Sequence, residues 1–340
     1  MSEKRAVGAT QRFFCYILQS MTPLQFLLSA VLLFVLAISA ILLPCVGQTF
    51  YAPGSEIYWL RFHRTALALI AGSGLALAGL VFQAMFRNPL ATPYTLGVAS
   101  GAAFGAALCL QTTMRLGLPS VIFAIPTVSF GAFLGAFLAM GVVLALSRRR
   151  DTTTEQMLLA GVAVNFFFSS LIVLLQYLSA PHDAFQILRW TMGGVQNATY
   201  AADWLRLLPI VLLLMLFFAS QSRTMNVFVT GNDRAKSLGV NVERFRTTLF
   251  IGTSLVVGAI VSVTGPIGFV GLLVPHVTRL LVGPDHRLLI ISTGFLGAVF
   301  LAVCDTLGRW IAHPAEFPVG IITGLLGGPF FLWLLLKRKG

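Results

Sequence analysis

The sequence predicts an all-α, polytopic membrane protein of about ten transmembrane helices, with both termini in the cytoplasm. Three observations predict this class: the composition, a series of long apolar runs, and the placement of the basic residues. Of the 340 residues, 57% are hydrophobic and only 10% are charged, whereas a soluble domain carries about 25% charged residues. Because so few charges could not cover a water-exposed surface, we expect residues 1–340 to form a single transmembrane domain.

Ten apolar runs follow one another along the chain, each close to the length of about 20 residues that a transmembrane helix requires. They are residues 24–43, 65–86, 94–110, 119–146, 157–178, 204–219, 247–264, 266–282, 288–311 and 319–336. The sixth and eighth runs are marginal in length. Only Gly265 separates the seventh run from the eighth, so either of these is open to interpretation as a broken or partial span.

The basic residues determine the predicted orientation. If the N-terminus lies inside, 17 of the 23 Lys and Arg residues fall on the cytoplasmic side and 6 on the outer side. Short cytoplasmic loops carry such an excess of Lys and Arg. An even number of spans then places the C-terminus inside as well. Because the basic residues flank apolar runs, the net charge of +12 indicates a lipid bilayer, and no nucleic acid, as the partner.

The N-terminal segment 1–22 is predicted to be a cytoplasmic tail. The first apolar run covers about 20 residues, more than the roughly 7–15 apolar residues of a signal peptide. We therefore interpret it as a retained first span. Residues 11–20 have two interpretations, an interfacial helix on the inner membrane surface or a disordered tail.

Two connections between the runs are long. The outer one, residues 180–203, contains Pro181 and Trp190. The inner one, residues 221–246, mixes charged and apolar residues, which is typical of two short amphipathic helices, here broken at Gly231 and Gly239. Such a surface either docks a cytoplasmic partner or lies on the lipid headgroups.

Glycine recurs at every fourth position in two of the runs. Four-residue spacing places these glycines on nearly one helix face, where the absence of side chains lets two backbones approach closely. The pattern is typical of ordinary helix packing, and it is compatible with a small-residue wall along a wide pathway or with a dimer seam. The two sets are Gly97, Gly101 and Gly105, and Gly320, Gly324 and Gly328.

No sequence pattern predicts enzymatic or metal-binding chemistry in this chain. The cysteines, Cys15, Cys45, Cys109 and Cys304, are scattered without ligand spacing, and the five histidines form no local ligand motif. The motifs HExxH, GxSxG and GxxxxGK[ST] are absent. We therefore expect no catalytic residue, metal or cofactor here, and any ATP hydrolysis must take place in another chain.

Charged residues within the runs are few. Asp305 and Arg309 lie four residues apart on one face of the ninth run, where they can pair near its outer end. Proton and ion relays usually require several ionisable groups in the membrane interior. The scarcity of ionisable residues within the runs of this chain therefore argues against transport driven by an ion gradient.

Six stretches carry distinctive motifs in a fixed order, and the longest of them begins Gly265-Pro266-Ile267-Gly268. The stretches are residues 82–94 with 96–102, 158–163, 190–194, 237–240, 265–276 with 283–287, and 316–320 with 328–333. Together they resemble the permease family for iron-siderophore, haem and cobalamin uptake, the FecCD-type membrane subunits of type II ABC importers. The resemblance runs from about residue 60 to the C-terminus.

This resemblance implies a bacterial protein of the inner (cytoplasmic) membrane that works in a complex. Two permease subunits form a homodimer or heterodimer, with the pathway at their interface. A periplasmic substrate-binding protein delivers the substrate, and two cytoplasmic ATPase subunits, which bind ATP and Mg, drive opening and closing. The substrate implied is a ferric siderophore or related metal chelate, with haem or cobalamin as alternatives. A secondary transporter driven by an ion gradient is the alternative class, and a membrane enzyme is the least favoured.

The resemblance also assigns the residues that dock the binding protein. The matching positions are Arg61, Arg64 and Arg309. Arginine suits this role because its forked guanidinium group holds a carboxylate with two hydrogen bonds, and the alternative role is anchoring at the membrane interface. The usual family pattern is Arg-Leu-Pro-Arg, from which Phe62 and His63 depart.

On the inner side, the resemblance assigns a gate and a coupling surface. The gate matches Asn88 and Leu90 after the second run, and Thr154 and Glu155 before the fifth. Glu155 departs from the small polar residue usual there, and its alternative role is to stabilise a helix N-terminus. The connection 221–246 matches the ATPase contact, which favours the docking interpretation of that segment. Its central residues are Gly231, Asp233, Ala235, Leu238 and Gly239.

Overall fold

The computed structural model describes residues 23–46, 53–116, 121–122, 125–147, 154–196, 201–311 and 316–337. Within these ranges the chain is almost entirely helical. The helices are α2 (Pro23–Leu42), α3 (Glu56–Phe86), α4 (Val98–Leu116), α5 (Thr127–Ser147), α6 (Thr154–Tyr177), α7 (Pro181–Thr191), α8 (Ala201–Ser220), α9 (Ser222–Val229), α10 (Asn232–Ser237), α11 (Val242–Thr264), α12 (Val270–Val282), α13 (His286–Ile311) and α14 (Val319–Lys337). The predicted tail 1–22 lies outside the described residues.

The predicted apolar runs reappear in order as ten helices: α2 to α6, α8 and α11 to α14. Over their described residues, α3, α5, α6, α8, α11 and α13 are long and apolar enough to cross a membrane, and the other four are shorter. The all-helical class is therefore confirmed, and these lengths agree with a membrane protein. The number of spans and the orientation of the termini stay predictions.

Three local features differ from the sequence prediction: the start of one helix, the start of the fourth run and the outer connection. The second helix begins at Glu56 because the Ser55 side chain caps it, accepting from Tyr58 N at 3.2 Å. The fourth run begins as a hairpin of two short antiparallel strands, β1 (Val121–Ile122) and β2 (Ile125–Pro126), before α5 starts. The outer connection 180–203 contains the unpredicted helix α7, which starts at a proline, a residue suited to the first helical position.

The break between the seventh and eighth runs is confirmed. Gly265 ends α11 with a φ of +67°, and Phe269 precedes α12 with a φ of +66°. The 13 residues of α12 correspond to a length of about 20 Å, less than the roughly 30 Å of the hydrocarbon core. The eighth run is therefore better interpreted as a partial span, whereas α8, with 20 residues, reaches full length.

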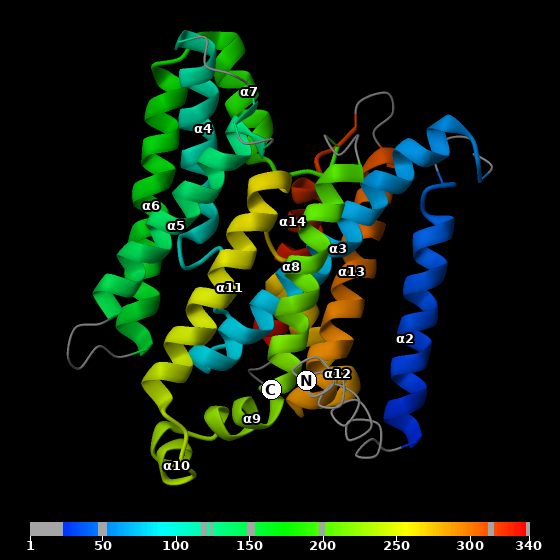
Figure 1. Ribbon diagram of the computed structural model, residues 1–340, viewed down its shortest axis with the longest axis vertical. Coiled ribbons are helices and arrows are strands. Elements are labelled where there is room, and N and C mark those ends of the chain that lie inside the picture. Colours follow the sequence, from blue (N-terminus) through cyan, green and yellow to red (C-terminus); the bar gives the residue numbers. More distant parts are fainter. Residues whose placement is uncertain are drawn as a thin grey trace, which may run out of the picture.

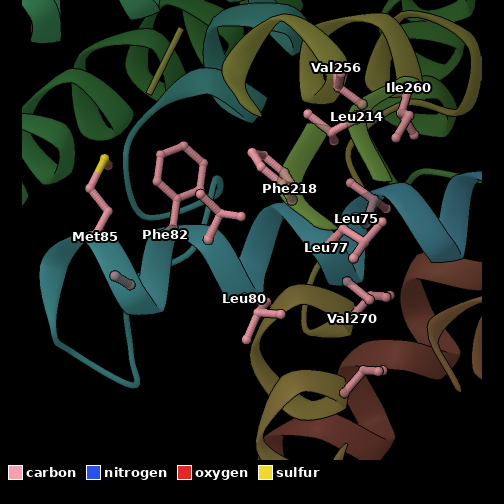
Figure 2. Close-up of a cluster of buried hydrophobic side chains, with 14 of the residues drawn as sticks. Leu75, Leu77, Leu80, Phe82, Met85, Leu214, Phe218, Val256, Ile260 and Val270 are labelled. Carbon is pink, nitrogen blue, oxygen red and sulfur yellow. The ribbon is translucent and has the colours of Figure 1, made fainter. Parts of the chain in front are cut away.

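Helix α3 forms the centre of the bundle. Figure 1 shows α4 to α7 gathered on one side and α2 on the opposite side, with α9 and α10 at the end away from α7. Around α3, α8 contributes Leu214 and Phe218, α11 contributes Ile260, and α12 contributes Val270 to one buried apolar cluster (Figure 2). Van der Waals packing of this kind holds transmembrane helices together, because lipid is as apolar as the helix surfaces.

Candidate functional site

Four charged side chains meet where α3 begins and α13 ends, at the predicted outer face. Arg64 donates to both carboxylate oxygens of Asp305, with an Nη2–Oδ1 distance of 2.8 Å and an Nε–Oδ2 distance of 3.1 Å. Its Nη1 donates to Glu316 at 2.5 Å. Arg309 Nε lies 3.3 Å from Asp305 Oδ2, which confirms the expected pairing across one helical turn. The structure therefore brings two of the predicted docking arginines around one carboxylate.

This outer charge cluster, Arg64, Asp305, Arg309 and Glu316, is largely buried. Arg64 is 8% exposed, Arg309 is 6% exposed and Asp305 is 1% exposed. Nη1 of Arg309 has no hydrogen-bond partner among the described residues, so the cluster retains a donor for one more acceptor. A buried charge is tolerated where opposite charges and hydrogen bonds compensate its lost hydration.

The third predicted docking residue, Arg61, is less deeply placed. It is half-buried and donates to the Val46 carbonyl oxygen at 3.1 Å. The Glu316 side chain, at 47% exposure, also reaches the surface. A partner that approaches this face therefore meets Arg61 and Glu316 first, and Arg64 and Arg309 lie behind them.

Glu316 lies between α13 and α14, outside the predicted spans. Partial burial alone would raise the pKa of its carboxyl, but the hydrogen bond and charge of Arg64 outweigh burial, and the pKa lies below its usual value. Glu316 is therefore ionised at neutral pH. A carboxylate whose folded pKa is lowered stabilises the fold above its unfolded pKa, and this contribution is lost as the pH falls through the folded pKa.

Removing the central carboxylate should destabilise the protein strongly. Asp305→Ala leaves two buried guanidinium groups without their shared partner, and breaking a buried pair costs about 3–5 kcal/mol. Glu316→Gln is the matched control, because the Glu316 side chain is half-exposed and solvent screens its pairing with Arg64 toward the roughly 0–1 kcal/mol of a surface pair. Thermal unfolding of the purified permease should show a large decrease in the midpoint for the first variant only. Equal midpoints would contradict a structural role for Asp305.

The inner connection forms the predicted pair of short helices, α9 and α10. The breaks fall at Gly231, with a φ of +134°, and at Gly239, with a φ of +84°. Phe228 and Ala235 are fully buried against the bundle, whereas Leu238 is 68% exposed. The segment is therefore anchored on one face and presents an apolar side chain on the other, as a docking surface requires.

Of the other predicted coupling residues, Asp233 is exposed in the first turn of α10. The predicted gate residues lie at two helix ends. Asn88 forms a turn after α3 in which its Oδ1 accepts from Leu90 N at 2.9 Å. Thr154 begins α6, although its side chain lies outside the described residues, and Glu155 is exposed in the first turn. An acidic residue in a first turn stabilises the positive end of the helix dipole, which is the alternative role predicted for Glu155.

The first set of glycines packs within the chain. A Cβ atom on Gly105 would lie 2.1 Å from the Gly131 carbonyl oxygen, and one on Gly101 would lie 2.6 Å from that of Gly135. These glycines therefore let α4 and α5 approach closely. Gly97 precedes α4 with a φ of +77° and does not share that helix face.

The second set behaves differently. A Cβ atom on Gly320 would lie 2.1 Å from the Met192 carbonyl oxygen, so this glycine packs against the end of α7. Gly324 and Gly328, in contrast, have no heavy atom within 4 Å of such a Cβ. Part of α14 thus presents small residues to open space on the surface of this chain.

Two further features were not found from the sequence. A cavity of about 330 Å³ beside α7 is lined by polar and aromatic side chains that include His182, Arg189 and Trp190. The sequence signal for this cavity is the spacing of polar residues along α7. That helix was not predicted, so the spacing could not be interpreted. The other feature is a contact between Asn226 of α9 and the start of α13. No group of His, Cys, Asp and Glu side chains among the described residues is arranged to hold a metal ion.

The chain matches known proteins along nearly its whole length. The model of the FecCD transport family matches residues 24–337. The hemin transport system permease protein HmuU of Yersinia pestis is 37% identical over 286 residues, which cover 83% of this chain and 84% of that protein. The vitamin B12 import system permease protein BtuC of Salmonella arizonae is 36% identical over 331 residues, 94% of this chain and 96% of that protein.

Solved structures agree with this assignment. A metal-chelate type ABC transporter, described in an inward-facing conformation, superposes with a TM-score of 0.82 at 30% identity, over 92% of this chain and 99% of the other. PsaBC from Streptococcus pneumoniae shares the fold at 19% identity with a TM-score of 0.53, over 82% of this chain and 95% of the other. The chain therefore belongs to the FecCD transport family and is an integral membrane permease subunit of the ABC importer class.

Proposed function

We propose that this chain is the membrane-spanning permease of an ATP-driven importer for a ferric siderophore or a related metal chelate. Haem and cobalamin are the alternative substrates, because permeases for both are relatives of this chain. The observation that carries the proposal is the family match across residues 24–337. The likeness to a metal-chelate type transporter supports the substrate class.

The partners in this proposal are a second permease subunit, two cytoplasmic ATPases and a periplasmic substrate-binding protein. The surface of α9 and α10, with Leu238 exposed, is the proposed ATPase contact. Arg61 and the outer charge cluster form the proposed contact for acidic residues of the binding protein, supported by the unused donor on Arg309. The turn at Asn88 and Leu90 and the start of α6 form the proposed cytoplasmic gate.

The substrate can be identified by ATPase stimulation. The permease, reconstituted with its ATPase and binding protein, is offered a ferric siderophore panel, haemin and cobalamin in separate reactions. We expect one of these classes to raise the hydrolysis rate above that with ligand-free binding protein. If none raises it although the complex assembles, the proposed substrate class is wrong.

The open glycines of α14 support a dimer seam. Gly324→Leu and Gly328→Leu each place a bulky side chain on a face that otherwise allows close backbone approach. We expect both variants to reduce the dimeric fraction of the permease in detergent, measured by light scattering. Gly141→Leu on α5 is the matched control, since Gly141 also has open space around its Cβ position. Unchanged dimerisation in both α14 variants would place the seam elsewhere.

A further inference from the structure

Helices α3 and α13 are long and packed side by side. Their 31 and 26 residues correspond to about 46 Å and about 39 Å at 1.5 Å per residue, longer than the roughly 30 Å hydrocarbon core. A Cβ atom on Gly72 would lie 2.2 Å from the Gly297 carbonyl oxygen, and one on Gly297 would meet Ala76. At this point the two helices therefore pack backbone to backbone. Figure 1 shows the two helices side by side near their outer ends, with α3 running obliquely to α13.

The outer ends of these two helices are joined by the outer charge cluster. Arg64 belongs to α3 and Asp305 to α13, and three hydrogen bonds of 2.8–3.1 Å connect them. The joined ends therefore lie within the proposed contact for the binding protein.

The inner end of α13 is held by the coupling segment. Asn226 of α9 accepts with its Oδ1 from His286 N at 3.0 Å, and His286 Nδ1 lies 2.7 Å from the same oxygen. The Asn226 amide donates to Asp285 Oδ1 at 2.7 Å, and that oxygen also accepts from Arg287 N at 3.0 Å. The first amides of a helix have no partner within the helix. A side chain of α9 therefore caps α13 from outside.

The inner end of α3 is held by the same segment. Arg87, which ends α3 with a φ of +47°, donates through Nη2 to the Phe228 carbonyl oxygen at 2.9 Å and to Asn232 Oδ1 at 2.7 Å. Its guanidinium carbon also lies 5.4 Å from the centroid of the Phe228 ring, within the range of a cation–π contact. Because Phe228 is fully buried, this contact is anchored.

We propose that α3 and α13 form a strut that transmits docking of the binding protein to the ATPase surface, with Asn226 and Arg87 as the positioning residues at its inner end. The inference rests on the proposed function, which assigns the two surfaces. A rigid helix pair tied at both ends transfers a displacement at one end to the other, and the α9 and α10 segment then changes its presentation to the ATPase.

The test uses the complete importer, with permease, ATPase and binding protein, in proteoliposomes. The measured quantity is the ATPase rate with binding protein divided by the rate without it. Coupling between two sites is typically about 5–150-fold, so we expect Asn226→Ala to reduce this ratio at least about fivefold. Ser55→Ala is the matched control, because it removes a side-chain cap from α3 without cutting a link to α9.

A swap of two residues separates transmission from simple stability. Asn226→Asp places a carboxylate against Asp285 and should reduce the ratio. Adding Asp285→Asn removes this repulsion and restores one donor between the two side chains, so the double variant should recover part of the ratio. This pair remains informative if Asn226→Ala does not fold.

Three results would overturn the proposal or what it rests on. If Asn226→Ala and Asn226→Asp keep the wild-type ratio, α9 does not receive the signal through this contact. If the double variant folds and hydrolyses ATP but does not recover the ratio, the contact is only structural. If the wild-type permease binds no ATPase, the proposed function fails, and the strut fails with it.

Discussion

Leu238→Asp combined with Gly239→Asp is expected to separate ATP hydrolysis from transport. Leu238 is 68% exposed at the centre of the α9 and α10 surface, and Gly239 has open space around it. Two carboxylates at positions 238 and 239 replace an apolar contact with charges. These charges would have to lose their hydration when the segment enters a groove of the ATPase. Loss of a central contact in an interface costs about 2 kcal/mol or more, which weakens docking by about 30-fold.

The measurement compares ATP-dependent uptake and co-purification of the ATPase with the wild type. Leu238→Asp alone is the cleaner variant, because Gly239 has a φ of +84° that a side chain strains. Thr248→Asp, an exposed position on α11 beyond the segment, controls for added negative charge. If uptake per ATP hydrolysed stays at the wild-type value, α9 and α10 are not the coupling surface.

Gly79→Leu is expected to prevent correct assembly of the bundle. A Cβ atom on Gly79 would lie 1.9 Å from the Gly271 carbonyl oxygen, so α3 and the start of α12 touch backbone to backbone. Overpacking a core costs about 1–3 kcal/mol, occasionally more. A clash with a backbone carbonyl cannot be relieved by a rotamer change, so the cost should reach or exceed the upper end of this range.

Size-exclusion chromatography of the solubilised protein measures this effect directly. We expect Gly79→Leu to yield aggregated or degraded protein and Gly79→Ala to lower the thermal midpoint. Gly252→Leu, at a glycine of α11 with no heavy atom within 4 Å of its Cβ position, should remain monodisperse. A monodisperse Gly79→Leu variant with a wild-type midpoint would show that α12 does not pack on α3 as described.

The helices could be predicted because their signals are local. An apolar run of sufficient length identifies a helix in lipid, and glycines with positive φ end helices, as at Gly231, Gly239 and Gly265. The pairing of Asp305 with Arg309 followed from their four-residue spacing. Helix α7 was missed because Pro181 and its mixed composition resemble a loop.

The contacts between distant segments could not be predicted. Arg64 and Asp305 are 241 residues apart, and Asn226 meets Asp285 only because α9 folds under the start of α13. In a membrane protein the lipid-facing and protein-facing sides of a helix are both apolar. The sequence alone therefore does not say that Gly101 packs inside the chain while Gly324 faces open space.

Uptake into sealed vesicles tests the central claim most directly. The vesicles hold this chain with its co-expressed ATPase, and its binding protein is supplied outside with radiolabelled iron chelate, haem or cobalamin. We predict that one ligand accumulates only when ATP is present inside, and that imposed proton or sodium gradients do not replace ATP. Accumulation that follows an ion gradient without ATP would contradict the account and identify the chain as a secondary transporter.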